Sequence, residues 1–148
     1  MNAPENHKLS EDDLDVLVSI AIQRAELLSE QHLANAREAW REVMEYEIRL
    51  VDLTDAGDVP GGVARVGAIA AALAAGHRYD AMSLRKKYLD DDRLPMERRK
   101  AIDRVFAEDQ EIRTKLYPSL TRRGGRLEDL AEWRRAGAAQ PRVFPCFA

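Results

Sequence analysis

Residues 10–56 decide the fold and read SEDDLDVLVSIAIQRAELLSEQHLANAREAWREVMEYEIRLVDLTDA, without one glycine or proline. A single helix over residues 11–53 would be about 65 Å long, at roughly 1.5 Å per residue. A compact domain of the chain's 148 residues would measure only about 40 Å across. We therefore expect this first helix either to break or to protrude, and the sequence leaves open a bend at residues 29–32.

The first helix has a clear start and an apolar seam along its length. Ser10 precedes three acidic residues, so its hydroxyl can accept an amide hydrogen bond beside charges that suit the helix dipole. Apolar residues then recur in steps of three and four, the spacing of a helix that is packed from end to end. The seam runs through Leu14, Val18, Ala21, Ala25, Leu28, His32, Ala36, Ala39, Val43, Tyr46, Leu50 and Leu53.

Glycine and proline divide the rest of the chain into shorter elements. Residues 52–62 contain three glycines and a proline, which predict a turn. A second helix is expected at residues 61–89. A third is expected at 95–117, because one proline suits its first turn and another follows its end. A short fourth helix, which Gly137 ends, and an extended tail follow.

These patterns predict an all-α fold. We expect a long antiparallel helical hairpin with a third helix packed on it, a short fourth helix and an extended C-terminal tail. The composition agrees, because aromatic residues make up only 6% and glycines number only 8, values that favour helices over a sandwich or barrel. We expect a flexible N-terminal arm at residues 1–9, a single helical-bundle domain at 10–137 and the tail at 138–148.

The charge is divided unevenly along the chain. Residues 1–60 carry 5 basic and 14 acidic side chains, whereas residues 61–148 carry 18 and 12. This asymmetry indicates either pairing of the two halves within the molecule or a basic surface for an acidic partner. Nucleic-acid binding is not favoured, because the basic clusters are interleaved with acids and no helix-turn-helix spacing is visible.

The sequence also indicates where the protein resides. Its only cysteine is Cys146, so no intrachain disulfide can form and a reducing compartment is favoured. The N-terminal residues lack the basic and apolar regions of a signal peptide. The most apolar later window, residues 63–75, is too short and too rich in alanine to cross a bilayer. We therefore expect a cytoplasmic protein with no membrane span.

Local signatures of nucleotide-binding, zinc-binding and nucleophilic enzymes are absent from the sequence. If the helices fold as antiparallel neighbours, four residues of metal-ligand type come to one level: Glu38, His77, Asp80 and Asp109. Ferritin-like di-iron bundles need Glu-x-x-His pairs, which this chain lacks, and we expect no cofactor. The alternative interpretation is a hydrogen-bonded pair, His77 with Asp80 or Asp109, that fixes the register of the helices.

The excess length of the first helix predicts a protein interface. Against a second helix of about 44 Å, around 20 Å of the first helix would stay uncovered at its N-terminal end. The expected partner-binding residues there are Leu14, Leu17, Val18, Ile20 and Ile22. The alternative is that the fourth helix or the tail folds back over them. The tail adds Phe144 and Phe147 beside Pro145, a segment suited to docking on this chain or on another.

Together these features predict a non-catalytic helical subunit or adaptor that self-associates or assembles into a larger protein complex. The partner would be another protein or further copies of this chain. The alternative function is a helical-bundle enzyme, or a protein that binds a metal or small ligand between its first three helices.

Overall fold

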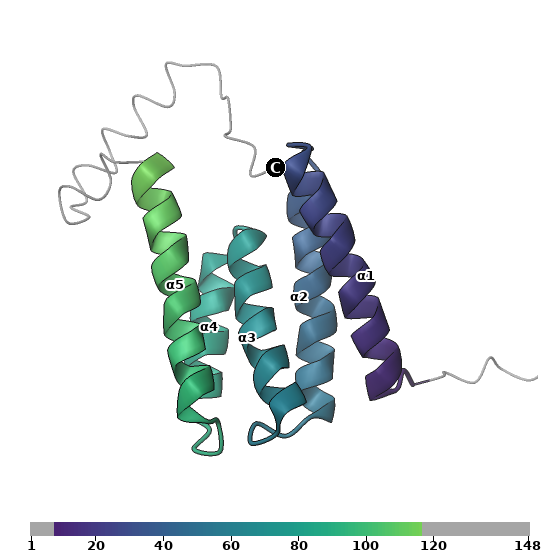
Figure 1. The fold of residues 1–148 in the computed structure, drawn as a ribbon, viewed down its shortest axis with the longest axis vertical. Coiled ribbons are helices and arrows are strands. Elements are labelled where there is room, and N and C mark those ends of the chain that lie inside the picture. The colour runs from purple at the N-terminus through teal and green to yellow at the C-terminus, as the bar shows by residue number, and fades with distance from the viewer. Residues whose placement is uncertain (1–7, 117–148) are drawn as a thin grey trace, which may run out of the picture.

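The computed structural model describes residues 8–116, and this part of the chain consists of helices and connecting turns, with no strand (Figure 1). The helices are α1 (Glu11–Glu30), α2 (Ala36–Leu53), α3 (Val59–Ala74), α4 (Arg78–Leu89) and α5 (Met96–Leu116). The all-α prediction is confirmed. None of the described helices is long and apolar enough to cross a membrane. The expected fourth helix, the tail and its residues Phe144 and Phe147 lie outside the described residues.

α1 begins where the sequence predicts, with a capping box at Ser10. The Ser10 hydroxyl accepts a hydrogen bond from the Asp13 amide at 3.2 Å, and the Asp13 carboxylate accepts one from the Ser10 amide at 3.1 Å. These bonds satisfy two amides that a helix start leaves without intrahelical partners.

The long segment without glycine or proline does not form one helix, because it breaks between α1 and α2. His32 has a φ of 53°, in the left-handed region. The amides of His32 and Leu33 donate to the carbonyls of Ser29 and Leu28 at 3.1 and 3.0 Å. This pattern is a Schellman motif, in which glycine usually occupies the position of His32. His32, which the sequence places on a helix seam, therefore terminates α1, and α2 folds back along it.

The helix expected at residues 61–89 is divided in the same way. Gly76 has a φ of 78°, and the amides of Gly76 and His77 donate to the carbonyls of Leu73 and Ala72 at 3.0 and 2.8 Å. This second Schellman motif has the usual glycine. His77 consequently lies at the N-cap of α4 and not in the middle of a helix.

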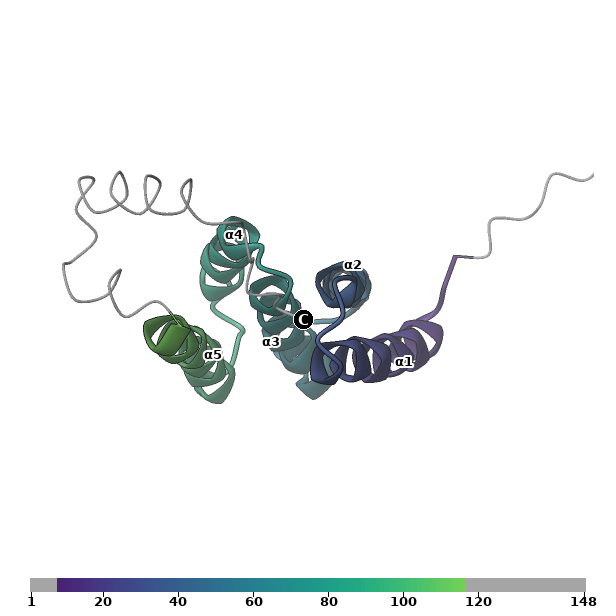
Figure 2. The same ribbon diagram turned by 90° about the horizontal axis from the view of Figure 1, so that it is seen from above.

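α3 lies at the centre of the arrangement. It packs against α2, α4 and α5, whereas α1 packs chiefly against α2. Figure 2 shows α3 in the middle, with α4 and α5 to its left and α1 and α2 to its right. The largest fully buried side chains come from four of the helices: Leu14, Val43, Ile69 and Ile102. α1 is therefore an edge helix, buried on its α2 side only.

Arginine side chains fix the turn from α4 to α5. Arg99 donates to the backbone carbonyls of Leu89 and Asp91 at 2.8 and 2.6 Å, groups that a helix end leaves without intrahelical partners. Arg93 donates to the carboxylates of Asp91 and Asp55 at 3.0 and 2.7 Å. These bonds lower the pKa of Asp91. Arg93 and Arg99 are therefore engaged in structural contacts.

Candidate functional site

The residues proposed from the sequence as metal or ligand candidates do not form one cluster. His77 Nδ1 lies 3.2 Å from Asp80 Oδ2, inside the first turn of α4. Asp109 on α5 accepts a hydrogen bond from Arg78 on α4 at 2.6 Å. One pairing that the sequence suggested for His77 is therefore present, but within a single helix. The contact that joins two helices is made by Arg78.

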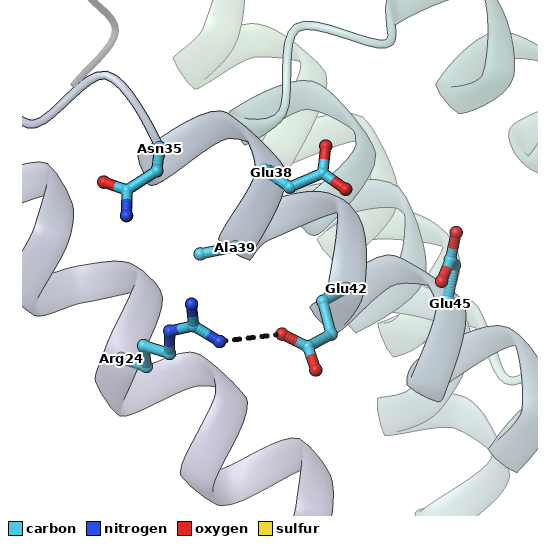
Figure 3. A pocket seen from close by; sticks show the side chains of 6 residues that line it. All are labelled: Arg24, Asn35, Glu38, Ala39, Glu42 and Glu45. Atoms are coloured by element: carbon cyan, nitrogen blue, oxygen red, sulfur yellow. Dashed lines mark hydrogen bonds and ion pairs between the residues drawn. The ribbon is translucent and has the colours of Figure 1, made fainter.

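The remaining candidate, Glu38, lines a half-open hollow between α1 and α2 (Figure 3). The hollow has a volume of about 300 Å³ and is lined by Arg24, Asn35, Glu38, Ala39, Glu42 and Glu45. Its three glutamates make it acidic, but Arg24 already donates to Glu42 at 3.3 Å. Over residues 8–116, no three His, Cys, Asp or Glu side chains are grouped so that they could hold a metal ion.

Glu47 is a buried acid that the sequence analysis does not single out. It lies on α2, is only 5% exposed, and makes no hydrogen bond or ion pair with any described residue. Its carboxylate packs against Gly67 of α3, where a Cβ atom would collide with it. Burial, with the charge of Asp15 on α1 as a smaller cause, raises the pKa of Glu47 to about 7. The signal for its burial is its spacing, four residues after Val43 and three before Leu50.

Two residues with polar groups, Arg65 of α3 and Tyr88 of α4, are buried in the core. The buried Arg65 guanidinium donates to the Gly61 carbonyl at 2.8 Å and lies 5.8 Å from the centre of the Tyr88 ring. Burial raises the pKa of Tyr88 to about 12. Arg65 is thus held by backbone and ring contacts within the core.

The most exposed apolar residues of α1 form an outer stripe, defined as Val16, Ile20 and Leu27. Their side chains are 59, 58 and 53% exposed. They are four and seven residues apart, so they lie on one face of the helix. Val16 and Ile20, with Asp15, Ser19 and Gln23, also line a shallow hollow of about 420 Å³. The stripe points away from α2, the helix against which α1 packs.

The structure distributes the expected partner-binding residues over different surroundings. Leu14 and Val18 are buried in the chain's own core, and Leu17 and Ile22 are half-buried, whereas Ile20 is exposed. The expectation of an uncovered end rested on a single helix over 11–53. Because α2 folds back along α1, the seam of α1 is covered, and the exposed surface is the opposite face.

A second apolar surface, the open face, lies on α3 and α5. We define it as Val59, Val63, Val66, Ala70, Val105 and Ile112. Val59, Val63 and Ile112 are 69, 49 and 51% exposed, and the other three are half-buried. Most of its residues recur at three- and four-residue steps along α3, so they form one stripe.

The neighbours of α3 show where the open face points. Gly62 packs against Arg98 of α5, and Gly67 packs against Glu47 of α2. Around the helix, Val63 lies between these two glycines. The face therefore points into the space between α5 and α2, whose ribbons lie on opposite sides of α3 in Figure 2.

α5 and α1 contribute different chemistry to the borders of the open face. On α5, Arg85 of α4 lies 5.0 Å from the centre of the Phe106 ring, and Val105 lies on the opposite side of buried Ile102. On α1, the exposed Asp15 lies close enough to Glu47 for its charge to raise the pKa of that carboxyl. The α5 side of the face carries the Arg98 cation beside Gly62 as well as apolar residues, and the α1 side carries the Asp15 carboxylate.

Comparisons of the chain with protein-family models, with curated proteins and with solved structures find no match. The described residues form two exposed apolar surfaces, the outer stripe and the open face, and they do not bring together the four residues expected to bind a metal or ligand.

Proposed function

We propose that this chain is a non-catalytic subunit or adaptor that binds another protein along the outer stripe of α1. The observation that supports this proposal is the exposure of Val16, Ile20 and Leu27, each more than half accessible, on a helix with its own core contacts on the opposite side. Large apolar side chains gathered on one helix face mark interaction sites more often than isolated ones do.

The stripe suits a helical partner. From Val16 to Leu27 it extends about 17 Å, or three turns of helix. A partner helix with apolar residues at three- and four-residue steps would match this length and spacing. The shallow hollow around Val16 and Ile20 would receive one of the partner's larger side chains.

The charge of α1 favours a basic partner over a second copy of the chain. α1 contains six acidic residues and one arginine, Arg24, and thus has a net charge of −5. Two copies of α1 packed side by side would bring like charges together, which opposes association. A basic amphipathic helix would combine the apolar contact with electrostatic attraction. The proposed partner is therefore a protein segment of that kind.

A peptide titration tests the proposal. The probe is a synthetic helical peptide with leucines at positions i, i+4, i+7 and i+11 and lysines or arginines elsewhere, labelled for fluorescence anisotropy. The full chain is compared with Val16→Ser/Ile20→Ser and with the control Tyr79→Ser/Met82→Ser, which removes exposed apolar residues from α4. We expect the α1 variant to bind about 30- to 100-fold more weakly, the control to bind like the wild type, and affinity to fall with added salt.

Two results would contradict this function. Equal affinities for the two double variants would show that the stripe is not the binding surface. A concentration-dependent dimer in sedimentation velocity that is lost in Val16→Ser/Ile20→Ser would show that the partner is a second copy of the chain and not a basic helix.

A further inference from the structure

The described helices leave the open face exposed. Val59, Val63 and Ile112 are about half exposed or more, although α3 is otherwise the most buried helix of the fold. On α3 the open face consists of valine and alanine side chains, which are small. Large side chains of another segment can therefore pack against it, and aromatic rings bury about 150–250 Å² each.

Residues 117–148 carry the matching chemistry. This segment holds six arginines and three acids, a net charge of +3, whereas residues 8–116 have a net charge of −5. Its larger apolar residues are Leu120, Leu127, Leu130, Trp133, Val143, Phe144 and Phe147. The net negative charge of residues 8–116 would attract such a segment.

The connection of this segment to α5 favours docking within one chain. α5 ends at Leu116, four residues after Ile112 of the open face, so the segment starts at the edge of the surface. Twenty-seven residues lie between Leu116 and Phe144, and a chain of that length can extend to about 90 Å, so its end can reach the open face. A tether of this length keeps its end at an effective concentration of about millimolar, well above that of a second molecule in dilute solution.

We propose that residues 143–147 dock on the open face of the same chain, with Phe144 and Phe147 against the valine and alanine stripe of α3. Pro145 between them restricts the backbone and lowers the entropy lost on docking. A second copy packed face to face fits less well, because residues 8–116 of both copies carry the same net negative charge. This inference is independent of the proposed function, which uses the outer stripe of α1.

The native Cys146 provides the test, since it is the only cysteine of the chain. Three variants of the full chain each add one cysteine at a position of similar exposure: Val63→Cys on the open face, Val16→Cys on the outer stripe and Met82→Cys on α4. The rate of disulfide formation within one molecule is measured at micromolar protein in a glutathione buffer, by mass spectrometry. Far-ultraviolet circular dichroism checks that each variant retains its helices.

Docking of Phe144 and Phe147 against the α3 stripe would bring Cys146 close to Val63, and a disulfide requires a Cα separation of less than about 7 Å. We expect Val63→Cys to form the intramolecular disulfide at least about tenfold faster than the other two variants. Adding Phe144→Ser and Phe147→Ser to Val63→Cys should lower its rate to that of Met82→Cys.

Three results would overturn the inference. Equal rates at the three positions would mean that the segment has no preferred site on the chain. A fastest rate at Val16→Cys would place the segment on the outer stripe. Disulfides formed mainly between molecules, or a rate unchanged by the two phenylalanine substitutions, would also refute docking by residues 143–147 within one chain.

Discussion

Replacing Glu47 by glutamine should raise the free energy of unfolding, by an amount that increases with pH. The Glu47 carboxyl has an ordinary pKa of 4.5 and a folded-state pKa of about 7, chiefly because it is buried. Between these values the folded protein holds a proton that the unfolded chain has released. Unfolding therefore releases a proton in this range, and the contribution of Glu47 to the free energy of unfolding falls as pH rises.

The size of the effect follows from the difference between the two pKa values. Each unit is worth 1.36 kcal/mol, so ionised Glu47 destabilises the fold by about 3 kcal/mol above pH 7. Below pH 4.5 the penalty is absent, because the carboxyl is neutral in both states. Glutamine has nearly the same shape as the protonated acid and does not ionise. Glu47→Gln should therefore equal the wild type in stability near pH 4.5 and exceed it by about 3 kcal/mol at pH 8.

Urea unfolding followed by circular dichroism, at intervals from pH 4.5 to pH 8, measures this difference. The comparison of variant and wild type isolates Glu47, because the other titrating groups are common to both proteins. The control is Glu38→Gln, the same substitution on the same helix at a side chain that is 72% exposed. A Glu47→Gln difference that does not change with pH would refute the argument, since it would show that folding does not neutralise Glu47.

Three further substitutions test the backbone and core. His32→Gly should raise the free energy of unfolding by about 0.5–1 kcal/mol, because glycine adopts the left-handed conformation of His32 without strain; no gain over His32→Ala in urea unfolding would contradict this. Gly67→Ala should lower stability by about 1–3 kcal/mol despite the better helix propensity of alanine, since its Cβ meets the Glu47 carboxylate; a stabilised variant would show the contact to be wrong. Arg99→Met should lower the thermal unfolding temperature by removing hydrogen bonds worth about 2 kcal/mol to backbone carbonyls, and an unchanged temperature would argue against that role.

Features that depend on nearby residues were predictable from the sequence. The start of α1 at Ser10 and the extent of α5 within the described range follow from capping and proline chemistry, which involve residues a few positions apart. The all-α class follows from composition and from apolar spacing. Gly76 indicates a possible helix end, but the alanine-rich sequence around it predicts a continuous helix.

The candidate surfaces were predictable only in part. Ile20 is exposed, as expected from the sequence, but Leu14 and Val18 are buried, because the turn after His32 brings α2 onto them. Val16 and Leu27 were recognisable as one face with Ile20 from their spacing. Which face of α1 stays outside depends on where α2 packs, and that requires the tertiary structure.

By itself, then, the sequence determined that the chain is helical, where several helices begin and end, and how its charges are divided. The tertiary structure decided that the long segment breaks at His32, that Glu47 is buried and that α3 keeps one apolar face open. The physical reason is the range of the interactions. The left-handed conformation of His32 costs about 1–2 kcal/mol locally. That cost is offset only when the apolar faces of two helices are buried against each other, and the residues on those faces are far apart in sequence.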